Sequence, residues 1–140
     1  MTIDIDKLFV FGDPKAQPRV RAFARGRHAR VYTPDTADAW KQAVVLAVRA
    51  QPFDPFAGAV WVDLLFVLPR PKRLRERWVW HTSKPDADNL AKAVLDALSQ
   101  AELWSDDAQV AKLTVKKRYA LPDEATGCWI EVQTLGQFTD

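Results

Sequence analysis

Cysteine and histidine are scarce in this sequence: one cysteine, Cys128, and two histidines stand among 140 residues. A single cysteine cannot form an intrachain disulfide, and it cannot build a cysteine-based zinc site. We expect Cys128 to be buried, because it stands in an apolar run typical of a β-strand. We interpret His28 and His81 as phosphate contacts or plain surface residues rather than as general bases.

Long apolar runs are also lacking. No stretch approaches the length needed to cross a bilayer. Residues 1–4 do not show the basic region followed by an apolar stretch that begins a signal peptide. We therefore expect a soluble, cytoplasmic protein. The length, without repeats or low-complexity tracts, predicts one domain covering residues 1–140.

The net charge is only +2, yet the charges are unevenly distributed. Two basic segments, 13–30 and 69–85, carry twelve of the twenty lysines and arginines. The residues in them that we expect to contact DNA are Arg19, Arg21, Arg25, Arg27, Arg30, Arg70, Lys72, Arg73, Arg75, Arg77 and Lys84. Residues 86–107 reverse the sign, with six acids and one base, Lys92. Acidic groups flanked by basic loops suit a polyanion held at metal ions. Solvated surface charge is the ordinary alternative.

The hydrophobic pattern predicts a small α/β (α+β) domain with the element order β-α-β-α-β-β. Thr33 is expected to cap the first helix, with Pro34 at its first position. The expected strands are 8–11, 60–68, 110–119 and 129–135, and the expected helices end near residue 50 and span 88–101. We expect segment 13–30 to be a loop or an irregular ribbon. The strands would form a four-stranded mixed sheet with two main helices on one face. The nearly continuous apolar strand 60–68 would be central, and strands 60–68 and 110–119 need not be neighbours.

The stretch from Lys84 to Lys92 reads Lys-Pro-Asp-Ala-Asp-Asn-Leu-Ala-Lys and begins a helical pattern. Asp86 is expected in the last extended residues before the helix, where a period of two would bring Asp86 and Asp88 towards one region. Lys92 falls on the same helix face as Asp88. A second acidic pair, Asp106-Asp107, precedes the strand at 110–119. Acidic clusters brought together by a helix, a turn and a strand can hold divalent cations.

Each of these acidic groups also has a simpler interpretation. Asp86 and Asp88 could belong to a turn and a helix cap, and Asp106-Asp107 could be an ordinary turn pair. Lys92 could form an intrahelical ion pair with Asp88 or Asp96. An EF-hand loop is excluded, because the sixth and twelfth positions counted from Asp86 are alanines rather than glycine and glutamate.

Three groups of residues together resemble the RusA family of Holliday junction resolvases. They are the stretch 84–92, the run Leu95-Asp96-Ala97-Leu98, and Asp106-Asp107-Ala108-Gln109-Val110. The segments Gly12 to Arg21 and Val31 to Pro34 are similar to the N-terminal part of phage-type members. The resemblance covers about residues 9 to 120.

The resemblance implies a homodimeric, Mg²⁺-dependent endonuclease that resolves four-way DNA junctions by paired symmetric nicks, in recombination and repair. Carried over to this sequence, it implies Asp86, Asp88 and Asp107 as catalytic metal ligands and Lys92 as the essential cation. Mn²⁺ is expected to substitute for Mg²⁺. The resemblance leaves the roles of Asp96 and Asp106 open and suggests a phage or prophage origin.

Two alternatives to this function stay open. One is a nuclease of other branched DNA, such as flaps or forks, and the other is a DNA-binding protein without catalysis. Trp78 and Trp80 could stack on unpaired bases at a junction. More often, such tryptophans cap an edge of the core.

Overall fold

In the computed structural model, residues 4–26 and 28–136 are described, without the side chains of Phe23 and Arg25. The elements in chain order are β1 (Ile5–Phe11), β2 (Arg21–Arg25), β3 (His28–Tyr32), α1 (Asp38–Arg49), β4 (Val60–Leu68), α2 (Ala87–Gln100), the 3₁₀ turn η1 (Asp107–Gln109), β5 (Val110–Tyr119) and β6 (Gly127–Thr134). No helix among them is long and apolar enough to span a membrane.

The predicted four-stranded mixed sheet is confirmed, with strand order β1-β6-β4-β5. Strand β4 is central, as its apolar run indicated. It pairs parallel with β5 along its whole length and antiparallel with β6. A parallel pair needs a crossover connection, and α2 supplies it between β4 and β5. The two strands whose adjacency the sequence left open are therefore neighbours.

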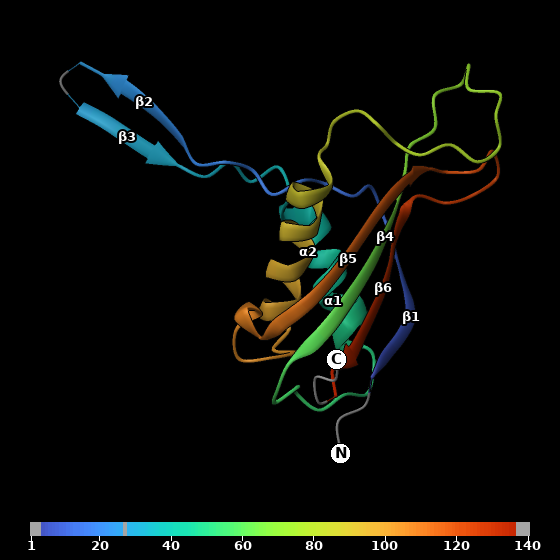
Figure 1. Cartoon of the computed structure of the whole chain (residues 1–140). Coiled ribbons are helices and arrows are strands. Elements are labelled where there is room, and N and C mark those ends of the chain that lie inside the picture. The colour runs from blue at the N-terminus through green and yellow to red at the C-terminus, as the bar shows by residue number, and fades with distance from the viewer. Residues whose placement is uncertain (1–3, 27, 137–140) are drawn as a thin grey trace.

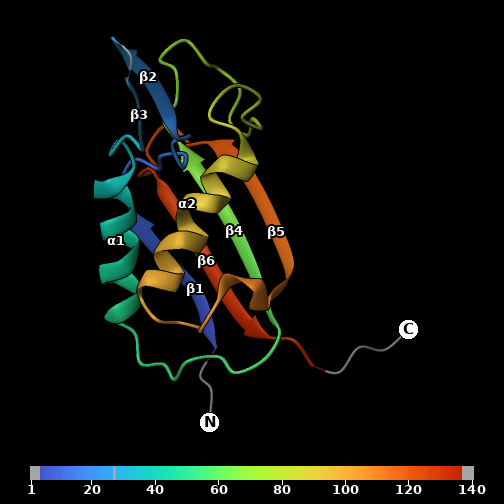
Figure 2. The same cartoon turned by 90° about the vertical axis from the view of Figure 1, so that its left-hand side faces the viewer.

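Helices α1 and α2 lie side by side on one face of the sheet (Figure 2). Alternate residues of β4, such as Val62, Leu64 and Phe66, are fully buried beneath them. Leu90 and Leu98 of α2 close the core from the helix side. Cys128 is buried in β6, as expected.

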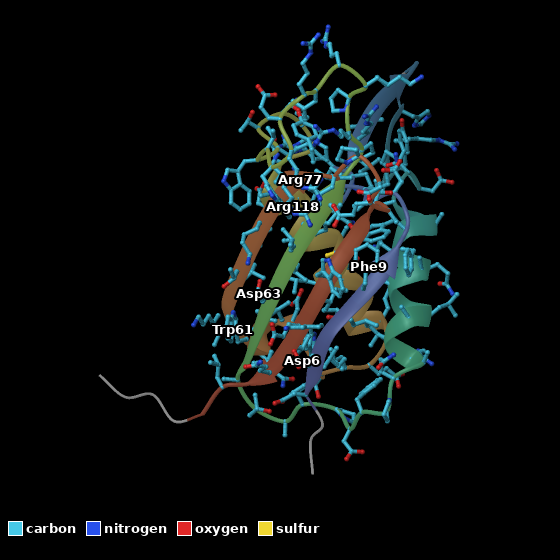
Figure 3. All side chains as sticks on the ribbon, turned by 90° about the vertical axis from the view of Figure 1, so that its right-hand side faces the viewer. Asp6, Phe9, Trp61, Asp63, Arg77 and Arg118 are labelled. Atoms are coloured by element: carbon cyan, nitrogen blue, oxygen red, sulfur yellow. The ribbon has the colours of Figure 1, made fainter. Side chains whose placement is uncertain are left out.

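None of the described helices covers the other face of the sheet, and side chains such as Phe9, Trp61 and Asp63 project from it (Figure 3). Burial along β4 alternates accordingly, with Trp61, Asp63 and Leu65 only half-buried. Helix α2 therefore faces solvent on the side of the molecule away from this open face (Figures 1 and 2).

The first helix begins later than predicted. It starts at Asp38, with Ala37 as its N-cap and no side-chain capping bond. The expected start at Thr33 and Pro34 is wrong because β3 extends to Tyr32, so the following residues must lead the chain back to the sheet. They form a turn in which the Asp38 N–H donates to the Asp35 carbonyl over 3.0 Å.

Segment 13–30 contains a regular hairpin instead of the expected loop or irregular ribbon. Strands β2 and β3 pair antiparallel from Arg21–Tyr32 to Arg25–His28 and project as an arm away from the body (Figure 1). Cross-strand partners share a face. The pairing therefore puts Arg21, Arg30 and Tyr32 on one face, and Ala22, Ala24, Ala29 and Val31 on the other.

Candidate active site

Asp86 stands at the N-cap of α2 in an extended conformation, with φ −73° and ψ 147°. Its side chain makes no capping hydrogen bond to the helix. The extended geometry confirms the expectation for this residue, and the missing cap bond removes the simplest structural explanation for its carboxylate. Asp86 lines a hollow with the two basic residues Arg19 and Lys84.

Asp88 and Lys92 are exposed on successive turns of α2. They line a groove whose other wall is formed by Leu113 and Val115 of β5, and Asp107 also lines it. Among the residues that the structure describes, neither Asp88 nor Lys92 is in an ion pair. The intrahelical pair considered for Lys92 is therefore not formed, and its ammonium group is available to a substrate.

Asp106 and Asp107 have different surroundings although they are neighbours in the chain. Asp106 caps η1: its carboxylate accepts from the Ala108 N–H over 2.8 Å, and the Gln109 side chain returns to the Asp106 N–H. Gln109 also donates to the carbonyls of Phe56 and Gly58 over 2.9 and 3.0 Å. Asp106 and Gln109 thus fasten the turn, which leaves Asp107 exposed at the groove.

The pKa of Asp107 is raised above its ordinary value. Partial removal from water is the largest cause, followed by the hydrogen bond to Asp106 and the negative charges of Asp106 and Asp96. A carboxyl group in this position favours a cation or a proton beside it.

The structure places the predicted carboxylates at two sites: Asp88 and Asp107 line one groove, and Asp86 lines a separate hollow. Helix α2 has 14 residues and is therefore about 21 Å long. Asp86 stands at its start, whereas η1 follows its end (Figure 1). Accordingly, Asp96, which lies in the second half of the helix, is one of the charges that raise the pKa of Asp107. The extended conformation that was expected to bring Asp86 and Asp88 towards one region ends at Asp86, because Ala87 is already helical.

This separation bears on a metal site. Within residues 4–26 and 28–136, no three carboxylate, histidine or cysteine side chains come together as metal ligands. The donor type still fits Mg²⁺, which prefers carboxylate oxygens and keeps several of its waters, so that one or two protein ligands suffice.

Asp96, whose role was open, is paired with another residue. The Lys41 ammonium of α1 donates to its carboxylate over 2.5 Å and to the Gln17 side chain over 3.3 Å. The Gln17 N–H donates to the Asn89 carbonyl over 2.9 Å. Lys41 and Asn89 therefore fix the base of the arm against α2, and Arg19 lines the same hollow as Asp86.

The second basic segment is organised by Arg70. Its guanidinium donates to the carbonyls of Leu74, Glu76, Arg77 and Ala120. Arg70 therefore shapes the loop, while Lys72, Arg73, Arg75, Arg77 and Lys84 are exposed. In the first segment Arg19, Arg21 and Arg30 are exposed; Arg27 and the side chain of Arg25 lie outside the described residues.

Trp78 and Trp80 are 65% and 62% exposed, so neither caps the core. The Arg118 guanidinium carbon lies 5.2 Å from the centre of the Trp78 ring. Arg118 also forms a bidentate ion pair with Glu124 over 2.6 and 2.9 Å. The hydrogen bond from Arg118, and to a smaller extent the charge of Arg77, lower the pKa of Glu124, so Arg77 of the loop (Figure 3) is near the same carboxylate. The two tryptophans thus present free aromatic surface next to a cation.

His81 corrects one expectation, because it is only 8% exposed. Its ring lies 4.7 Å from that of Tyr119, between ring centres. Burial, and then the charge of Lys117, lower the pKa of His81, which keeps the imidazole neutral near pH 7. The main chain of His81 pairs with the edge of β5, where its N–H donates to the Lys117 carbonyl over 3.1 Å. This pairing holds the residue against the sheet.

Lys117 was missed as a candidate from the sequence. Its ammonium donates to the carbonyls of Ser83 and Pro85 over 2.6 and 2.7 Å, directly before Asp86. The available signal was its position in β5, where it follows Leu113 and Val115 in the alternation that faces α2.

Comparison with known proteins identifies a family and similar proteins. The family model described as "Endodeoxyribonuclease RusA" matches residues 12–132. An uncharacterised protein of Bacillus subtilis, YqaN, is 33% identical over 129 residues, which cover 84% of this chain and 90% of that protein. A crossover junction endodeoxyribonuclease of Lactococcus phage r1t is 38% identical over 61 residues, covering 44% of each chain.

Proposed function

We propose that this chain, which belongs to the RusA family of endodeoxyribonucleases, is a structure-selective enzyme that resolves Holliday junctions. As a family member it is an endodeoxyribonuclease. The finer part of the proposal is Mg²⁺-dependent cleavage by paired symmetric nicks, in DNA recombination and repair. The phage relative, named a crossover junction endodeoxyribonuclease, supports this substrate and a phage or prophage origin. We also propose that the protein works in the cytoplasm.

The observation that carries the proposal is the arrangement of charges around the start of α2. Asp86, Asp88 and Lys92 project from this region without ion pairs among the described residues. Arg19 and Lys84 line the hollow of Asp86. Carboxylates between basic groups suit a phosphodiester whose neighbouring phosphates are held by cations.

Mg²⁺ is proposed as the cofactor, with Asp86 and Asp88 as ligands at the start of α2 and Asp107 as a ligand towards the other end of the groove. Asp86 and Asp88 stand two residues apart and provide oxygen donors of the kind this ion prefers. Asp107 lies further along the groove, and its raised pKa is consistent with a carboxylate that a cation would stabilise. When bound, Mg²⁺ would activate a water molecule and stabilise the leaving oxygen.

The chain's own side chains would bind and orient the DNA. The ammonium of Lys92, one turn after Asp88, would offset the negative charge that grows on the scissile phosphate. Arg19 and Lys84 would hold the backbone beside Asp86. The exposed Trp78 and Trp80 would stack on bases that are unpaired at the crossover.

Incubation with synthetic DNA tests the proposal and both alternatives. A four-way junction, a flap, a fork and a linear duplex are each incubated with the protein, with Mg²⁺ and with EDTA. We expect paired nicks in the four-way junction only, and only with Mg²⁺. Preferred cutting of flaps or forks would instead identify a nuclease of other branched DNA. Binding without cutting would identify a DNA-binding protein without catalysis, and the variant Asp88→Asn serves as the inactive control.

A further inference from the structure

We propose that Lys117 is a positioning residue for the cleavage reaction, and this inference rests on the proposed nuclease function. Lys117 would hold the segment Ser83–Asp86, so that the Asp86 carboxylate and Lys84 stand correctly beside the DNA. The inference goes beyond the residues suggested by the sequence, because Lys117 belongs to a strand and stands far along the chain from the stretch 84–92.

The contacts of β5 show how the segment is held. The chain from Val79 to Pro85 runs along the free edge of this strand, because β5 is the last strand of the sheet. Main-chain bonds fasten its first part: the Tyr119 N–H donates to the Val79 carbonyl over 3.0 Å, and the His81 N–H to the Lys117 carbonyl over 3.1 Å. After residue 81 the main-chain pairing with β5 ends within the described residues, and the Lys117 side chain continues it.

The Lys117 ammonium makes two short bonds, to the carbonyls of Ser83 and Pro85 over 2.6 and 2.7 Å. Hydrogen bonds from a charged donor are shorter and stronger than neutral ones. Pro85 is the residue directly before Asp86, whose extended conformation begins α2. The Asp86 carbonyl accepts the Leu90 N–H over 3.0 Å and so belongs to the first turn of α2, whereas Lys117 holds the carbonyl directly before it. The Asp86 carboxylate makes no capping bond, so its position depends on the backbone that these two contacts fix.

The charge at this place argues against a merely structural role. A helix N-terminus carries a partial positive charge, which disfavours a cation beside it. Lys117 nevertheless places an ammonium against the carbonyls of Ser83 and Pro85, the residues on either side of Lys84. Such a concentration of positive charge is useful where a phosphate and the Asp86 carboxylate must both be held.

Three variants test the inference. Lys117→Met removes the ammonium and keeps most of the stem, and Lys117→Arg retains a charged donor. Lys116→Met is the matched control: Lys116 is the adjacent residue, is exposed, and its ion pair with Asp63 is long, at 4.0 Å. Each protein is compared with the parent by hydrogen exchange without metal, by junction binding in EDTA, by cleavage at saturating DNA, and by thermal melting.

We expect Lys117→Met to increase amide exchange several-fold in residues 83–89 and to slow cleavage by about 10- to 100-fold, as for loss of a residue that orients a ligand. Junction binding should stay within about threefold of the parent. Lys117→Arg should recover both readouts at least in part, and Lys116→Met should match the parent. Melting curves show whether each variant is folded under the assay conditions.

Two results would overturn the inference. One is parental exchange and parental cleavage in Lys117→Met. The other is weaker junction binding with a lower salt dependence, which would make Lys117 a direct phosphate contact. If the parent itself does not cut junctions, the proposed function fails instead, and the exchange data still decide whether Lys117 holds the segment.

Discussion

Asp106 and Asp107 show how far neighbouring residues of the same type can differ. The Asp106 carboxylate caps η1, whereas Asp107 is exposed at the groove beside α2 and has a raised pKa. The folded pKa of Asp107 lies above the unfolded value. Its contribution to stability is therefore present below the unfolded pKa and is lost as the pH rises through the folded pKa.

The two residues should thus respond oppositely to substitution. Asp107→Asn should be at least as stable as the parent at neutral pH in EDTA. Any gain in stability should vanish below about pH 4, where the Asp107 carboxyl of the parent is neutral in both the folded and the unfolded state. The melting temperature of Asp107→Asn should rise less with Mg²⁺ than that of the parent, and the variant should fail to cleave junctions. Asp106→Ala should lose about 1 kcal/mol of stability as a cap is removed. Thermal melts with and without Mg²⁺, alongside a cleavage assay, check both. A destabilised Asp107→Asn with a normal metal response would reduce Asp107 to a turn residue.

Lys92 supplies a second prediction at the residue scale. Because its ammonium has no ion pair among the described residues, Lys92→Met should leave folding and junction binding nearly intact. Cleavage should fall on the order of a hundredfold or more, as when one donor to the transition state is lost. Single-turnover rates measure this. Lys112→Met is the control, since Lys112 lies over Trp61 on the open face of the sheet. A cleavage rate near that of the control would show that Lys92 is a surface charge.

The arm formed by β2 and β3 has two chemically different faces. A two-stranded hairpin is marginal by itself in water, and here all the described side chains of β3 are exposed. The bond from Gln17 to Asn89 fixes the base of the arm. Because one face of this exposed ribbon is basic, we propose that the arm acts against a large anionic surface.

The pairing of the arm allows the two faces to be tested separately. Arg21→Gln with Arg30→Gln should weaken junction binding and lower the slope of log affinity against log salt by roughly one for each lost phosphate contact. Ala22→Ser with Val31→Thr changes the opposite face and should leave that slope unchanged. Affinity is measured between about 50 and 200 mM salt. Equal salt slopes for the two double variants would show that the arginines of the arm are solvated surface residues that do not contact phosphates.

The loop 69–85 combines one organising arginine with several exposed bases. Arg70 donates to four carbonyls, and Arg73 has no hydrogen bond within the described part of the chain. Removing either charge should therefore have different consequences for the loop.

Arg70→Met should loosen the loop, and proteinase K should cut residues 71–78 several-fold faster, because exposed segments with few fixed contacts open most readily. Arg73→Met should be cut at the parental rate but should lower the salt slope of junction binding by about one. Mass spectrometry of the fragments locates the cuts. The interpretation of Arg70 fails if both variants are digested alike.

At the scale of the whole molecule, one chain carries one set of predicted catalytic residues, whereas a four-way junction must be cut on two opposed strands. Paired incision in one binding event therefore requires two subunits, and a two-fold symmetric dimer matches the symmetry of the substrate. We predict a homodimer with both sites facing the DNA. Light scattering at micromolar concentration, free and junction-bound, measures it. A monomer in both states would exclude paired cutting by a preformed dimer.

The sequence by itself determined the elements of the body and the residue types of the site. Strand β4, α2 and β5 follow from apolar periodicity within one or two residues, because burial against a common core imposes that spacing. The start of α1 and the hairpin of the arm were not predicted. The described side chains of the arm's strands are all exposed, so the hydrophobic pattern carried no signal for them.

Tertiary structure decided which of the polar residues act together. Asp96 pairs with Lys41, 55 positions earlier in the chain, and Lys117 bonds to carbonyls 34 and 32 positions before it. Such contacts join distant segments and leave no local pattern. The separation of Asp107 from Asp86 has the same origin: the sequence shows a helix between the two acidic groups, but only the packing of α2 along β5 sets the distance over which that helix holds them apart.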